Sequence, residues 1–92
     1  MADESKGPNL LIVEDDSELS TSLVLYLESE DYEVTLAETG EDGLEEATRL
    51  PGYDLIILDA KLPDRNGFEV LRRAREDGVK TPVLMLTGLG DH

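Results

Sequence analysis

The chain contains no cysteine, which excludes a disulfide framework, a thiolate metal site and a thiol nucleophile. It also has no long hydrophobic run. The aliphatic runs Leu10–Val13, Leu55–Leu58 and Val83–Leu86 have four residues each, whereas a membrane-spanning helix needs about 20. The first eight residues are polar and lack the apolar segment of a signal peptide. We therefore expect a cytoplasmic protein that does not enter a membrane.

Basic residues are scarce. The 92 residues include 8 Lys and Arg against 22 Asp and Glu, which gives a formal net charge of −14. All of this imbalance lies in residues 1–59, which hold 17 acidic and 2 basic residues, whereas residues 60–92 hold 5 acidic and 6 basic residues. Nucleic acid and anionic membrane surfaces attract clustered Lys and Arg, so the sequence argues against both as partners. Such a block of negative charge repels itself unless something cationic relieves it.

The length allows one small domain, since domains usually have roughly 100–200 residues. Residues 1–8 are polar and include Gly7-Pro8, so we interpret them as a disordered N-terminal lead-in. Residues 9–92 then form the domain.

Within the domain, strand patterns alternate with helix patterns. Strands are expected at Leu10–Val13, Glu33–Ala37, Leu55–Leu58 and Pro82–Thr87. The second alternates polar and apolar residues, as a strand near a sheet edge does, and the others are apolar runs typical of strands covered on both faces. Helices are expected after Asp16 or Ser17, over Thr39–Arg49, and between Gly67 and Gly78. Each helix should bury one stripe of side chains. The stripes are Leu19, Leu23, Tyr26 and Leu27 in the first helix, Leu44 and Ala47 in the second, and Phe68, Val70, Leu71 and Ala74 in the third.

Strands separated by single helices predict an α/β fold, a doubly wound parallel sheet with helices on both faces. The functional site of such a sheet lies at the carboxyl ends of its strands. Glu14 and Asp15 follow the first strand, Asp59 follows the third, and Thr87 ends the fourth. We expect the three carboxylates to lie within a few ångströms of one another.

Three carboxylates in one place are unfavourable unless they share a proton or bind a cation. Hard oxygen ligands with room for water suit Mg²⁺ or Mn²⁺. Asp16, the next residue, is explained equally well as a helix cap. An acid such as Asp59, which ends a buried strand before an irregular loop, has no cap to make, and this favours a functional carboxylate there.

These residues resemble the receiver domain of two-component response regulators. The similarity rests on Leu10–Asp15 (LLIVED), Asp54–Gly67 (DLIILDAKLPDRNG) and Pro82–Thr87 (PVLMLT). It implies a flavodoxin-like strand order of 2-1-3-4, with the fifth strand and the last two helices absent. We therefore interpret residues 9–92 as a partial receiver domain, truncated after the fourth strand.

The resemblance also implies roles for individual residues. Asp59 would be the phosphoacceptor, and Glu14, Asp15, Asp59 and the backbone carbonyl of Lys61 would bind Mg²⁺. Thr87 would be the switch hydroxyl that moves toward the phosphoryl group. A histidine kinase or phosphotransfer protein would be the partner, and the domain would be no enzyme beyond slow self-dephosphorylation.

The resemblance stops at His92, where a receiver normally continues. The family's Lys that pairs with the phosphoryl group and its aromatic switch residue lie in the segment that would follow. We therefore expect the chain to be less stable than a full receiver, or to associate with itself through an open sheet edge.

Three other functions stay open at this point. A degenerate receiver that serves only protein contacts is compatible with the missing Lys. A Mg²⁺-dependent phosphatase with an Asp nucleophile needs a second Asp two residues later, where Lys61 stands. A flavodoxin-like cofactor binder needs a Ser-, Thr- and Gly-rich loop after the first strand, where Glu14, Asp15 and Asp16 would repel a phosphate.

Overall fold

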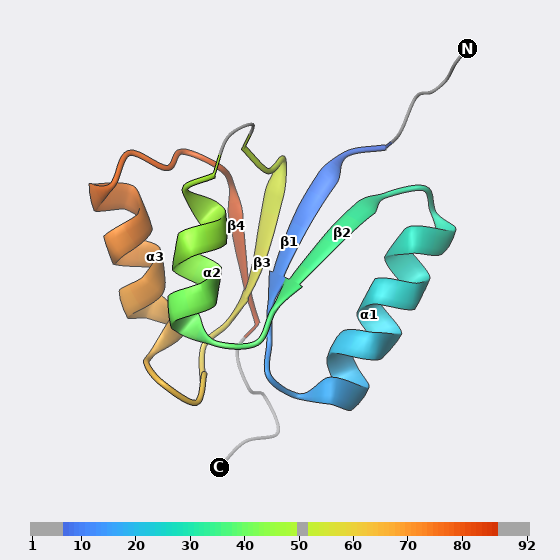
Figure 1. The fold of residues 1–92 in the computed structure, drawn as a ribbon, viewed down its shortest axis with the longest axis horizontal. Coiled ribbons are helices and arrows are strands. Elements are labelled where there is room, and N and C mark those ends of the chain that lie inside the picture. Colours follow the sequence, from blue (N-terminus) through green and yellow to red (C-terminus); the bar gives the residue numbers. More distant parts are fainter. Residues whose placement is uncertain (1–6, 50–51, 87–92) are drawn as a thin grey trace.

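The computed structural model describes residues 7–49 and 52–86. The elements in these ranges are β1 (Asn9–Val13), α1 (Ser17–Ser29), β2 (Glu33–Ala37), α2 (Gly40–Ala47), β3 (Leu55–Asp59), α3 (Gly67–Glu76) and β4 (Val83–Leu86). All three strand pairs are parallel, and the order in the sheet is β2-β1-β3-β4. The expected α/β fold and strand order are therefore confirmed (Figure 1).

The helices form layers on the two faces of the sheet. α2 and α3 pack against each other on one face, and α1 lies on the other (Figure 1). β1 and β3 are the central strands, and their apolar runs are buried apart from the half-buried Leu55, as continuous apolar strands should be. The core beneath α2 and α3 contains Leu11, Val13, Ala37, Ala47, Ile56, Leu58 and Val70.

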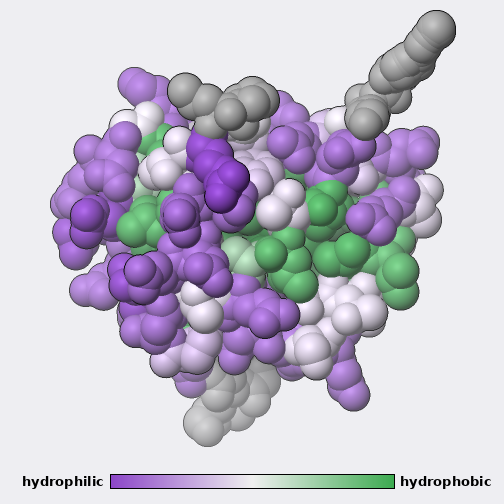
Figure 2. Space-filling view, in the orientation of Figure 1, coloured by the Kyte–Doolittle hydropathy of each residue, from purple (hydrophilic) through white to green (hydrophobic). Residues whose placement is uncertain are grey.

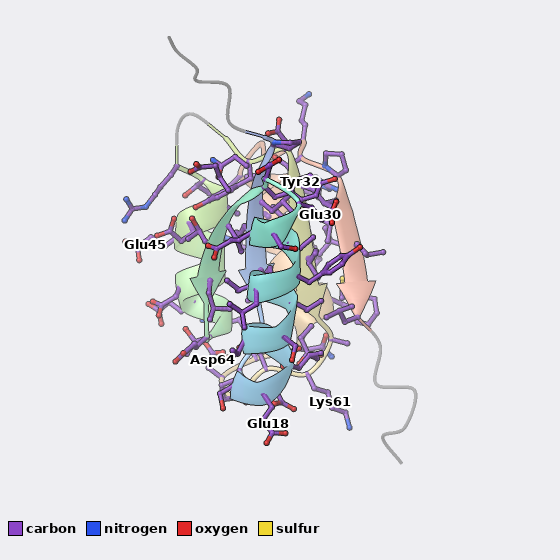
Figure 3. The ribbon with its side chains drawn as sticks, turned by 90° about the vertical axis from the view of Figure 1, so that its right-hand side faces the viewer. Glu18, Glu30, Tyr32, Glu45, Lys61 and Asp64 are labelled. Atoms are coloured by element: carbon purple, nitrogen blue, oxygen red, sulfur yellow. The ribbon has the colours of Figure 1, made fainter. Side chains whose placement is uncertain are left out.

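The face that carries α1 is covered unevenly. α1 contacts β2, and Figure 3 shows it in front of the β1–β2 half of the sheet, with β4 to one side. Leu84 of β4 is 53% exposed, and Leu25 of α1 is 65% exposed. Figure 2 shows apolar side chains at the surface over β2 and the adjoining side of α1. The described part of the chain thus leaves apolar surface on this face open to solvent.

The stripe expected for the first helix is partly wrong. Leu19 and Tyr26 are 43% and 63% exposed, whereas Ser20 is buried. The buried face starts at Ser20 and continues through Leu23, Val24 and Leu27, all half-buried, at the i, i+3, i+4, i+7 spacing of one helix face. The small Ser20 therefore begins the buried face, where a prediction based on apolar residues alone placed Leu19.

In α3, too, the buried face begins at a different residue from the predicted one. Phe68, expected to face inward, is 51% exposed. The buried face starts instead at Gly67 and continues through Val70, Leu71 and Ala74, again at i, i+3, i+4 and i+7. The other three residues expected in this stripe do face inward, with Leu71 half-buried.

Residues 1–6 of the expected lead-in lie outside the described part of the chain. Of the other two, Gly7 donates its N–H to the Asp31 carbonyl, and the Pro8 carbonyl accepts the N–H of Glu33, each at 2.9 Å. Among the described residues, no helix has the length and apolarity that crossing a bilayer requires.

Candidate metal centre

Three acidic side chains meet at the carboxyl edge of the sheet. β1 and β3 are adjacent and parallel, so their ends lie together. Glu14 and Asp15 follow β1, and Asp59 is the last residue of β3. One carboxylate oxygen from each lies within 4.8 Å of the other two. The structure therefore brings together the three acids that the sequence pointed to.

Glu14 is the innermost of the three, with 3% of its surface exposed. Its Oε2 accepts the backbone N–H of Asp16 at 2.9 Å. Burial raises the pKa of Glu14 above its ordinary value of 4.5, the Asp16 N–H opposes this, and Asp59 and Asp15 raise it further. A negative charge at this position is unfavourable without a cation beside it.

The cluster opens to solvent on its other side, because Asp15 is exposed and Asp59 is half-buried. Mg²⁺ usually binds one or two carboxylates and keeps several waters. A buried carboxylate at the base and two more accessible ones above it offer hard oxygen ligands, and the open side leaves room for waters. The residues present fit a site for Mg²⁺ or Mn²⁺.

Asp16 caps α1 and is not one of the three clustered acids. Its Oδ1 accepts the N–H groups of Glu18 and Leu19, at 3.0 and 3.2 Å, and it is the N-cap of α1. The helix-cap interpretation of Asp16 is therefore confirmed. Because α1 begins directly after the acidic pair, this cap also fixes the path of the chain beyond Asp15.

The segment after β3 folds back on itself. The N–H of Lys61 donates to Asp59 Oδ1 at 3.3 Å, and Lys61 forms an antiparallel bridge with Asn66. Gly67 donates its N–H to the Ala60 carbonyl at 2.8 Å, and a Cβ at Gly67 would overlap the carbonyl oxygen of Asp59. Glycine is thus required here by a close approach of two backbone segments. The backbone of Lys61, expected to supply a metal oxygen, lies directly beside Asp59.

Asp64 is a residue of this region that the sequence did not reveal. Its two carboxylate oxygens accept the N–H groups of Gly40 and Glu41, at 2.7 and 2.9 Å. The hydrogen bond from the Gly40 N–H is the main cause that lowers the pKa of Asp64 below its ordinary 3.8. The hydrogen bond from the Glu41 N–H and the positive charge of Arg65 lower this pKa as well. No local pattern marks this role, because the partners lie in a different element.

Thr87, the expected switch hydroxyl, lies outside the described residues. The preceding residue, Leu86, is paired with Asp59 in the sheet, and its carbonyl accepts the N–H of Ala60 at 3.0 Å. β4 therefore ends at the same edge as the acidic cluster.

Comparisons with known proteins agree with this geometry. Residues 10–92 match the family described as the response regulator receiver domain. Over 80 residues the chain is 45% identical to the cell cycle response regulator CtrA of Brucella ovis, an alignment that covers 87% of this chain and 34% of CtrA. The chain thus spans about a third of the length of the curated relatives it matches.

Solved structures show the same similarity. The signal receiver domain of a putative Luxo repressor protein from Vibrio parahaemolyticus is 36% identical, with a TM-score of 0.81 over 91% of this chain and 64% of that one. The MaeR response regulator bound to beryllium trifluoride is 30% identical, with a TM-score of 0.76 over 92% of this chain and 70% of that one.

Proposed function

Because this chain belongs to the response regulator receiver domain family, we propose that it accepts a phosphoryl group on Asp59 from a histidine kinase or phosphotransfer protein. Members of this family are typically phosphoacceptors rather than enzymes. One observation carries the proposal: Asp59 ends a central strand with Glu14 and Asp15 beside it, all within 4.8 Å. A phosphatase of the Asp-nucleophile class is disfavoured, because the position two residues after Asp59 is Lys61.

Glu14, Asp15, Asp59 and the Lys61 carbonyl would hold the divalent cation. Mg²⁺ or Mn²⁺, when bound, supplies the positive charge that offsets repulsion between a carboxylate and an anionic phosphoryl group. The backbone around Asp59 and Lys61 holds these ligand groups in position. Asp59 is fixed in the sheet by its pairing with Leu86, and the Lys61 N–H orients its Oδ1.

The proposed reaction transfers a phosphoryl group from a histidine nitrogen of the partner to Asp59. A carboxylate oxygen of Asp59 forms a bond to phosphorus while the bond between phosphorus and the donor nitrogen breaks. The nitrogen keeps the electron pair of that bond, and the histidine is regenerated. The product is an acyl phosphate, which carries about −2 charge and three acceptor oxygens. We propose that the Thr87 hydroxyl then donates to one of these oxygens and that this movement switches an output.

The test is the mass of the intact protein after incubation with acetyl phosphate and Mg²⁺. We expect one adduct of about 80 Da, the mass of a phosphoryl group, which Asp59→Asn abolishes. Asp16→Asn is the matched control, because Asn caps helices as well as Asp does, and it should retain the adduct. Multiple turnover of the donor without an adduct would favour a phosphatase. No adduct in a version extended by the remaining receiver elements would favour a degenerate receiver.

A second measurement follows from a relative. MaeR has been solved bound to beryllium trifluoride, a small stand-in for a phosphoryl group. If Asp59 is the acceptor here, beryllium fluoride with Mg²⁺ should shift the NMR signals of residues around Asp59, and Asp59→Asn should not respond. A response that Asp59→Asn retains would place the acceptor elsewhere.

The remaining assignments rest on the family. A histidine kinase is the general partner of receiver domains, and their usual location is the cytoplasm. The net charge of −14 argues against nucleic acid or an anionic membrane as a direct partner of this segment.

A further inference from the structure

The loop between β3 and α3, residues 60–66, is anchored at its base and at its tip. At the base, the Lys61–Asn66 bridge and the hydrogen bond from Gly67 to Ala60 close it against Asp59. At the tip, Asp64 reaches across to the first turn of α2. A short two-stranded ribbon is only marginally stable by itself, so the attachment at the tip contributes to holding the loop in one position.

The attachment at the tip is more extensive than a helix cap requires. α2 has its own N-cap, Thr39, whose Oγ1 accepts the N–H of Asp42 at 3.1 Å. Asp64 adds two further bonds, one through each carboxylate oxygen. The stem of Arg65 lies against Gly40 so closely that a Cβ there would be 2.6 Å from Cγ of Arg65.

These contacts join α2 to the loop that carries Lys61. Figure 3 shows Lys61 and Asp64 at the same end of the molecule as Glu18, at the start of α1. A metal-binding oxygen must be held to within about 0.5 Å by groups that are themselves fixed. The backbone carbonyl of Lys61 has no rotamers of its own, so its position depends on the loop alone.

We propose that Asp64 is a positioning residue of the metal centre: by tying the tip of the 60–66 loop to the N-terminus of α2, it holds the Lys61 carbonyl in place for a divalent cation. This inference rests on the proposed function, since it takes Lys61 as a ligand. Removing groups that orient metal ligands typically costs 10–100-fold in metal affinity. For one backbone ligand among several, we expect a loss of about tenfold.

The test is the affinity for Mn²⁺, measured by the electron paramagnetic resonance signal of free Mn²⁺ at a temperature where every variant is folded by circular dichroism. Asp64→Ala should bind Mn²⁺ about tenfold more weakly. The matched control is Thr39→Ala, which removes the other cap of α2 without touching the loop. It should lose stability and keep its Mn²⁺ affinity within about twofold.

Two further variants change how Asp64 holds α2. Asp64→Asn keeps the length but has one acceptor oxygen, so it can keep only one of the two bonds to Gly40 and Glu41, and it should lose less affinity for Mn²⁺ than Asp64→Ala. Asp64→Glu keeps the charge but is longer by one methylene, which displaces the loop, and should bind Mn²⁺ more weakly. This pair decides the question even if Asp64→Ala fails to fold.

Equal affinities of Asp64→Glu and the wild type would overturn the inference, as would a loss in Thr39→Ala as large as that in Asp64→Asn. Either result would leave the phosphoacceptor role intact, because that role is measured separately by the adduct on Asp59. A wild-type protein that forms the adduct but binds no Mn²⁺ would overturn the metal centre and this inference together.

Discussion

The carboxylate oxygens of Glu14 and Asp59 lie within 4.8 Å of each other at the ends of two adjacent strands. This proximity is unfavourable for the folded chain without a cation, because Glu14 is buried and both groups carry the same charge. In the proposed metal centre, the same proximity creates the affinity for a divalent ion. The arrangement that would bind the cation therefore lowers the stability of the cation-free protein. This cost can be measured by removing one of the charges.

Glu14→Gln should stabilise the protein in the absence of divalent ions. The variant removes one of the clustered charges and keeps an oxygen for the Asp16 N–H. We expect a gain of about 1 kcal/mol at pH 7 from reduced repulsion, which corresponds to roughly 4–8 °C in melting temperature. Mg²⁺ should raise the melting temperature of the wild type more than that of the variant, in thermal unfolding followed by circular dichroism.

The pH dependence has a definite sign. The pKa of Glu14 is raised in the folded state, so its charge destabilises the protein above the ordinary pKa of 4.5 and not below it. The advantage of Glu14→Gln should therefore disappear as the pH falls below 4.5. Glu30→Gln, an exposed change at the opposite end of the molecule (Figure 3), is the control. A Glu14→Gln variant that melts below the wild type without Mg²⁺ would contradict this account.

Asp64 should show the opposite pH dependence. Its pKa is lowered from 3.8, so its contribution to stability is complete above pH 3.8 and is lost as the pH falls through the lower folded value. We expect the stability difference between wild type and Asp64→Asn to be constant near neutral pH and to shrink in acid. Urea unfolding at pH 7, 4 and 2.5 measures it. A difference that persists unchanged at pH 2.5 would show that the charge of Asp64 contributes nothing.

Gly67→Ala should disturb both the fold and the site. The added Cβ would overlap the Asp59 carbonyl oxygen and lie 2.9 Å from Cα of Ala60, so the backbone at the start of α3 must shift. Overpacking of this kind costs about 1–3 kcal/mol. We also expect slower formation of the adduct on Asp59, measured by intact mass. Gly52→Ala, where a Cβ meets nothing within 4 Å, should change neither quantity; similar losses in both variants would refute the steric explanation.

The apolar surface on the α1 face should cause self-association once charge repulsion is screened. Leu84 and Leu25 are more than half exposed, while the net charge of −14 keeps copies apart at low salt. The screening length falls from about 10 Å at 0.1 M salt to about 3 Å at 1 M. Sedimentation velocity should therefore show a larger species that grows with salt and concentration, and Leu84→Glu should reduce it. A monomer under all these conditions would contradict the prediction.

The strands and their order could be predicted from the sequence. Apolar runs such as Leu55–Leu58 are distinctive, and single helices between them restrict the sheet to parallel crossovers. The meeting of Glu14, Asp15 and Asp59 then followed from topology, because parallel strands end at one edge. The roles of these acids and of Thr87 rest on the family resemblance and stay predictions.

The buried helix faces were harder to predict. Ser20 and Gly67 begin the inward faces of α1 and α3, yet neither is apolar, so a search for apolar residues selected Leu19 and Phe68 in their place. Small residues at these positions let a helix approach its neighbour closely, and apolarity does not measure that. Asp64 was missed for another reason: its hydrogen bonds connect segments far apart in the chain, and only tertiary structure reveals them.

The second helix depends on parts of the chain that it does not contain. α2 has eight residues, including Gly40 and Gly43, and a helix so short does not persist alone in water. Its first turn is completed by Asp64, and a Cβ on Gly43 would lie 2.7 Å from the Val13 side chain. Residues 40–47 should therefore be helical only when β1 and the turn after β3 are folded. In hydrogen exchange, the amides of α2 should open together with those of the 60–66 loop, as one cooperative unit.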